Sequence, residues 1–81
     1  MAILNITYNG LSADYPLELD PGTVDRDIKR IAVEVVRSGN ARGLHLPHLA
    51  DDAFEHFVVD RLQDGLRIYL RPKVPFGADR R

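Results

Sequence analysis

The sequence predicts an α+β domain in which one main helix packs on one face of a mixed sheet of about four strands. Three observations lead to this prediction. The chain opens with two stretches of period-two alternation, continues with one stretch of helical period, and then returns twice to strand character. One helix covering one face of such a sheet is a compact arrangement for this order of elements.

The composition fits a single small domain. The chain has 81 residues, 44% of them hydrophobic, and no cysteine, so it has an ordinary core and neither disulfides nor thiolate metal sites. Its formal net charge of −1 argues against a nucleic-acid partner, because such proteins usually carry a basic surplus. No apolar run reaches the roughly 18 residues of a membrane span. The start at Met1 lacks the features of a signal peptide, so we expect a cytoplasmic protein with no membrane partner.

The first twenty residues are expected to form a β-hairpin. Apolar and polar side chains alternate in both arms, and the inward set is Ala2, Leu4, Ile6, Tyr8, Tyr15, Leu17 and Leu19. Asn9-Gly10 between the arms is a strong turn signal, because both residues tolerate positive φ. Pro21-Gly22 ends the second arm.

A helix is expected over residues 24–38. Thr23 is the expected N-cap, and Asp25 and Asp27 then lie favourably at the positive end of the helix dipole. Gly39 is a suitable stop after the last turn. Apolar residues recur at helical spacing on the face expected to be buried: Val24, Ile28, Ile31, Ala32 and Val35.

The middle of the chain is the least regular part of the pattern. Residues 40–53 either form a short helix that begins at Pro47 or are irregular. Strand character returns between Phe54 and Leu62, but both parities carry apolar residues, so the pattern does not fix the inward face.

The last strand follows a second hairpin signal, Asp64-Gly65. Its alternation places one set of residues inward, Leu66, Ile68 and Leu70, and the other set outward, Arg67, Tyr69 and Arg71. Because a helix supplies the crossover, the first and last strands are expected to lie parallel at the sheet centre. Pro72 and Pro75 end regular structure, so a domain over 1–71 is followed by a flexible tail over 72–81.

Several segments resemble the ubiquitin family. Met1-Ala-Ile-Leu-Asn-Ile-Thr-Tyr-Asn-Gly10 and Tyr15-Pro-Leu-Glu-Leu-Asp20 look like its first hairpin, and Pro21-Gly-Thr-Val-Asp25 with Ile28-Lys-Arg-Ile31 is similar to its helix entry. Gly65-Leu-Arg-Ile-Tyr-Leu-Arg71 is similar to its last strand. The resemblance covers roughly residues 1–38 and 57–77, and the middle third departs from it. It implies a ubiquitin-like β-grasp fold.

The tail extends this resemblance. The family's modifiers end in an arm that closes on glycine, and here the arm from Pro72 to Gly77 precedes Ala78-Asp-Arg-Arg81. The resemblance implies that a JAMM-type peptidase cleaves between Gly77 and Ala78. An E1-like activating enzyme would then adenylate the Gly77 carboxylate, and an E2-like enzyme would carry it to target proteins. The residues expected to be recognised in the arm are Pro72, Lys73, Val74, Pro75 and Phe76.

One position in the arm indicates which members of the ubiquitin family this chain resembles most. Phe76 stands where a second glycine is common, which weakens the likeness to ubiquitin itself and to the sulfur carriers. The ending is more similar to the bacterial ubiquitin-like modifiers that are encoded beside E1-like, E2-like and JAMM-type genes. Two other functions remain open: a non-covalent β-grasp adaptor, and a sulfur carrier with a thiocarboxylate on Gly77.

The resemblance also assigns surface residues. Binding domains dock on the outer face of the family's sheet, which implies that Arg67, Tyr69 and Arg71 form a partner surface. Lys29 and Lys73 are the only lysines, so they are the candidate acceptors if the protein forms chains.

No enzyme, cofactor or metal site is expected. His45, His48 and His56 are spaced by three and eight residues in a chain without cysteine, which is a poor match to a zinc site. Asp51, Asp52 and Glu55 lie near His56 in the sequence as acid–base candidates. No nucleophile or phosphate-binding glycine loop accompanies them.

Overall fold

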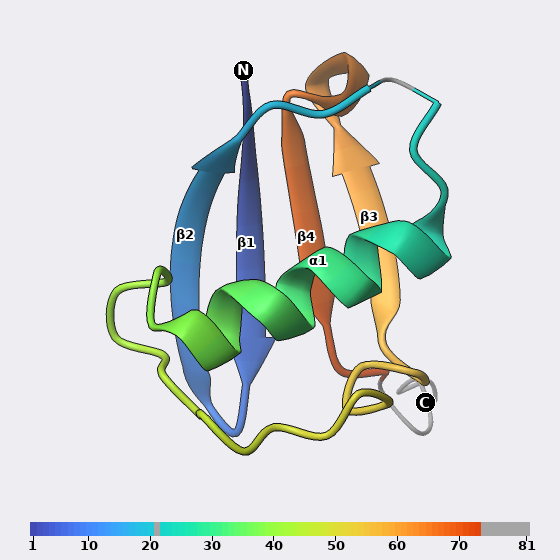
Figure 1. Ribbon diagram of the computed structural model, residues 1–81. Helices are drawn as coiled ribbons and strands as arrows, with labels where there is room; N and C mark the ends of the chain where they lie inside the picture. Colours follow the sequence, from blue (N-terminus) through green and yellow to red (C-terminus); the bar gives the residue numbers. More distant parts are fainter. Residues whose placement is uncertain (21, 74–81) are drawn as a thin grey trace.

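The computed structural model describes residues 1–20 and 22–73. These form, in chain order, β1 (Ala2–Tyr8), β2 (Leu11–Leu17), α1 (Asp25–Ser38), β3 (Val58–Leu62), the short turn η1 (Gln63–Gly65) and β4 (Arg67–Arg71). The strands make one sheet in the order β2-β1-β4-β3, and α1 crosses one face of it (Figure 1). The predicted α+β fold is confirmed, and the arrangement is consistent with a β-grasp-like fold.

The first and last strands are parallel neighbours at the centre of the sheet, as the helical crossover predicts. Their register runs from Ile3 opposite Arg67 to Ile6 opposite Leu70. β2 pairs with β1 and β3 pairs with β4, both antiparallel. The turn between β1 and β2 uses Asn9 at φ 52° and Gly10 at φ 79°, which is the left-handed conformation expected of an Asn-Gly turn.

The core lies between α1 and the inner face of the sheet. The central strands contribute fully buried side chains, and α1 contributes others that recur at helical spacing. Those with 0–1% of their surface exposed are Leu4, Ile6, Ile68, Leu70, Ile28, Ala32 and Val36. Burial of this apolar surface is the main stabilising contribution to the fold. Among the residues described, α1 is too short and too polar to cross a membrane.

The segment between α1 and β3 contains turns and no regular helix, so Pro47 opens none. It nevertheless completes the core through Ala41, Leu44, Leu49 and Phe54, which are all buried. The Phe54 ring packs edge-on against Tyr8, with centroids 5.7 Å apart, and against Phe57 at 4.9 Å. Such aromatic pairs add to the free energy of burial.

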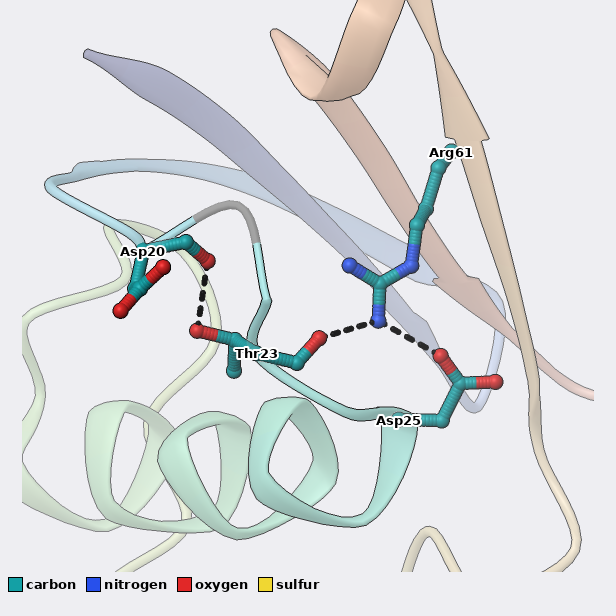
Figure 2. A network of polar contacts seen from close by, with 4 residues as sticks. All are labelled: Asp20, Thr23, Asp25 and Arg61. Carbon is teal, nitrogen blue, oxygen red and sulfur yellow. Dashed lines mark hydrogen bonds and ion pairs between the residues drawn. The ribbon is translucent and has the colours of Figure 1, made fainter.

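The predicted N-cap was wrong. Val24 occupies the cap position, no side chain caps the helix there, and Val24 itself is 51% exposed. Thr23 instead belongs to the preceding turn: its hydroxyl donates to the Asp20 carbonyl at 2.8 Å, and its amide donates to the same oxygen at 2.9 Å (Figure 2). The hydroxyl is therefore not available to the first turn of α1.

The predicted inward position of Leu66 was also wrong. Leu66 is 54% exposed, whereas Ile68 and Leu70 are buried as expected. Leu66 has helical backbone angles, φ −74° and ψ −23°, after a turn in which Gln63, Asp64 and Gly65 all have positive φ. The extended alternation therefore starts only at Arg67. In β3, Val59 packs against the core and Val58 is 37% exposed, which settles the face that the sequence left open.

Candidate functional site

The predicted partner residues lie together on the outer face of the sheet, opposite α1. Arg67, Tyr69 and Arg71 alternate along β4 with the buried Ile68 and Leu70. Because β4 is a central strand with a paired neighbour on each side, its backbone is fixed by both ladders. The structure thus holds these three side chains on a rigid support.

Strand register defines two rows of side chains across this outer face. We call the first the apolar row: Pro16, Ile3, Arg67 and Leu62, one from each strand. We call the second the polar row: Asp14, Asn5, Tyr69 and Asp60. Cross-strand neighbours of this kind lie close enough for direct contact. On the outer face, the Arg67 cation therefore lies between apolar side chains. The neighbouring polar row has a carboxylate at each end, Asp14 and Asp60.

Tyr69 holds the Arg67 side chain in place. The Arg67 Nε donates to the Tyr69 hydroxyl oxygen at 3.0 Å, and the Arg67 Cζ lies 5.6 Å from the centroid of the ring. The hydrogen bond with Tyr69 is the main cause that raises the pKa of Arg67, and the Asp14 carboxylate adds a smaller effect in the same direction, while desolvation opposes both. An arginine guanidinium is protonated at physiological pH, so Arg67 is a cation there.

The two carboxylates of the polar row have their own partners. Asp60 pairs with Arg71, whose Cζ lies 5.9 Å from the centroid of the Tyr69 ring. Asp14 accepts a hydrogen bond of 2.8 Å from the Asn5 amide. In the described ranges, 1–20 and 22–73, Arg67 has no carboxylate within ion-pair distance, whereas five other arginines do: Arg26, Arg30, Arg37, Arg61 and Arg71.

The predicted processing and attachment site lies outside the described residues. This applies to Gly77 and Ala78, and to the arm positions Val74, Pro75 and Phe76. The described start of the arm, Pro72 and Lys73, is exposed at the surface beyond β4. The chain therefore leaves the sheet at the surface.

The two lysines differ in their surroundings. Lys29 is half-buried, and its Nζ donates to the Glu55 carbonyl at 3.0 Å, so it is less accessible than the predicted outward position on the helix implied. Lys73 is exposed. The helical period placed Lys29 correctly on the helix, but it could not show that the segment before β3 folds against that part of α1.

A groove of about 700 Å³ lies between α1 and this segment. Arg26 and Arg30 line one wall and Asp52 and Glu55 the other. The three histidines are exposed, and the described part of the chain brings no three His, Asp or Glu side chains close enough to hold a metal ion. No pattern in the sequence indicates this groove, because the groove depends on the tertiary position of an irregular segment.

Comparison with protein-family models, with curated proteins and with solved structures gave no match to this chain. Its function is therefore inferred from the fold and from the surface residues described above.

Proposed function

We propose that this chain is a bacterial ubiquitin-like protein modifier that is processed after Gly77 and conjugated through the Gly77 carboxylate. The supporting observation is the way the chain leaves the domain. β4 ends at Arg71 in the centre of a β-grasp-like sheet, and Pro72 and Lys73 continue from it at the surface. In the sequence, the stretch Pro72–Phe76 separates this exit from Gly77, which is the length that such an arm requires.

The proposed chemistry is carried out by cytoplasmic partner enzymes, and the chain is their substrate rather than an enzyme. A JAMM-type peptidase hydrolyses the bond between Gly77 and Ala78. The released carboxylate attacks the α-phosphate of ATP on an E1-like enzyme, and pyrophosphate leaves. A cysteine thiol then displaces AMP to form a thioester, which passes to an E2-like enzyme and finally to an amine of the target protein. Glycine suits this sequence because it has no Cβ to obstruct a narrow active-site channel.

Intact mass spectrometry tests the proposal. The full chain is co-expressed with an E1-like enzyme and a JAMM-type peptidase, and the expected product is lighter by the residues Ala78–Arg81. Gly77→Val should remain full length. The matched control Gly22→Ala, where an added Cβ meets no atom closer than 3.7 Å, should be processed normally.

If the chain without substitutions retains Arg81 under these conditions, the proposal is contradicted. Exchange of one oxygen for sulfur at the new C-terminus would instead identify a sulfur carrier.

A second candidate function, a non-covalent adaptor, is favoured by the fixed arrangement of Arg67 and Tyr69 on the outer face. Arginine and tyrosine are enriched in protein interfaces, and a side chain that is already ordered loses less entropy on binding. An adaptor would bind its partner equally well after Gly77→Ala, whereas Tyr69→Ala would weaken binding. A modifier would instead lose conjugation after Gly77→Ala.

A further inference from the structure

The groove between α1 and the segment before β3 has two walls of opposite charge. We propose that this groove is a docking surface for a second copy of the same chain, related to the first by a two-fold axis that runs along the groove. The basic wall is formed by three residues of α1, and the acidic wall by three residues of the segment: Arg26, Lys29 and Arg30, and Asp51, Asp52 and Glu55.

The basic wall carries more positive charge than its own helix neutralises. The side chains of Arg26 and Arg30 are 86% and 72% exposed, and both pair with one carboxylate, Asp27, at 3.8 and 3.3 Å. Lys29 donates to the backbone carbonyl of Glu55, which does not neutralise its charge. The wall therefore keeps a positive surplus that an incoming carboxylate can meet.

The acidic wall carries the opposite surplus. Asp51 is paired with Arg37 at 2.7 Å. Asp52 and Glu55 are exposed, and over residues 1–20 and 22–73 no cation lies within ion-pair distance of either carboxylate. The cations of the basic wall therefore do not reach across the groove within one chain, and a second copy can supply the missing cations.

Two contacts fix how the walls run relative to each other. Arg37, in the last turn of α1, bonds to Asp51, whereas Lys29, one turn after the start of α1, bonds to the Glu55 carbonyl. The acidic wall therefore runs antiparallel to α1. Glu55 consequently lies beside the same half of the helix as Arg26 and Arg30.

A two-fold axis along the groove lays the basic wall of each copy over the acidic wall of the other, so that every ion pair across the interface forms twice. An axis across the groove would instead place walls of like charge face to face, so the charges select the first arrangement. The formal net charge of −1 gives the two copies little overall repulsion.

Glu34 is the acidic side chain that lines the groove on the α1 side. It lies one turn beyond Arg30, toward the end of the groove where Arg37 already neutralises Asp51. Its repulsion of the second copy is therefore limited to this end. The attraction is concentrated at the other end, where Arg26 and Arg30 meet Glu55 of the second copy.

This inference does not depend on the conjugation proposal, because the association uses neither Gly77 nor a partner enzyme. The test uses the full chain alone, in sedimentation velocity over a range of protein concentrations. One variant, Arg26→Glu with Arg30→Glu, reverses the basic wall, and a second, Asp52→Lys with Glu55→Lys, reverses the acidic wall. Each variant should stay monomeric at concentrations where the unaltered chain dimerises. An equimolar mixture of the two should form dimers again, because each wall then faces a wall of opposite charge.

A third variant controls for attraction between oppositely charged proteins. Asp14→Lys with Glu18→Lys, at two exposed carboxylates outside the groove, adds the same positive charge as the change to the acidic wall. Mixed with the Arg26→Glu, Arg30→Glu variant, it should not restore the dimer. Restoration by this control would show that net charge, and not the groove, drives the association.

Salt provides a test on the unaltered chain. The walls are exposed to solvent, so each ion pair contributes little and the dimer is weak; its dissociation constant should rise roughly tenfold between low and high salt. A chain that stays monomeric at millimolar concentration, a dimer that is insensitive to salt, or a dimer that survives both wall reversals would each overturn the proposal. The salt measurement stands even if a variant fails to fold.

Discussion

One nitrogen of Arg61, Nη2, donates both to the Asp25 carboxylate at 2.7 Å and to the Thr23 carbonyl at 2.8 Å (Figure 2). Arg61 lies in β3, which is an edge strand with a ladder only to β4, and Asp25 is the first residue of α1. The interaction therefore joins the edge of the sheet to the start of the helix. It also supplies a donor to a backbone carbonyl at the helix entry.

Replacement of Arg61 tests this connection. Arg61→Ala is expected to lower the free energy of unfolding by about 1 kcal/mol, because a charged donor to two acceptors is lost. The side chains of Arg61 and Asp25 are 32% and 61% exposed, so solvent screens the ion pair. Its coupling in a double-mutant cycle with Asp25→Ala should therefore be only about 0.5 kcal/mol and should fall at high salt. Urea denaturation at two salt concentrations measures the loss of unfolding free energy in Arg61→Ala and the coupling free energy between Arg61 and Asp25.

Arg42→Ala is the control for this prediction, because Arg42 is exposed and should change stability little. Additive effects of Arg61→Ala and Asp25→Ala would show that the contact does not stabilise the protein.

Gly39 is expected to tolerate alanine less well than Gly10. Both have positive φ, 81° and 79°, so Ala should cost about 1 kcal/mol at each through the backbone alone. At Gly39 an added Cβ would also lie 3.3 Å from the His45 ring, whereas at Gly10 it meets no atom within 4 Å. Thermal unfolding of the two variants should reveal the difference. The difference in stability between the two variants should become smaller when His45 is also replaced by alanine. If the difference persists in the His45→Ala background, the His45 ring is not its cause.

Phe54 is expected to be the most sensitive position in the irregular segment. It is 1% exposed and contacts both Tyr8 and Phe57, so Phe54→Ala should cost about 3–5 kcal/mol. This is a large part of the roughly 5–15 kcal/mol that stabilises a typical domain. Urea denaturation measures the loss. Leu11→Ala, at a residue that is 53% exposed, is the control and should change stability by less than about 0.5 kcal/mol. Equal losses would mean that Phe54 is not a core residue in solution.

The elements with a clear period were predictable from the sequence. The alternation around Leu4 and Ile68 reflects strands with one buried face, and the helical spacing of Ile28 and Ala32 reflects a helix on a sheet. Thr23 and Leu66 were misplaced for a different reason. Each depends on the backbone angles of a neighbouring turn, and residue type alone does not determine those angles.

The site was predictable only in part. Period-two alternation placed Arg67, Tyr69 and Arg71 together on one face, as the structure has them. It could not supply Ile3 and Leu62 as neighbours of Arg67, because they come from two other strands whose register is set by tertiary structure. Cleavage and attachment at Gly77 remain predictions from the sequence, since that residue lies outside the described part of the chain.

Tyr69→Phe is expected to loosen Arg67 without unfolding the domain. The substitution removes only the hydroxyl that accepts from the Arg67 Nε, at a half-buried surface position, so the free energy of unfolding should change by less than about 1 kcal/mol. The Arg67 Hε proton should then exchange faster with water. Arginine side-chain NMR measures the exchange rate, and Tyr15→Phe on the opposite face is the control. If Hε exchange is the same in both variants, the Tyr69 hydroxyl does not hold the Arg67 guanidinium in place.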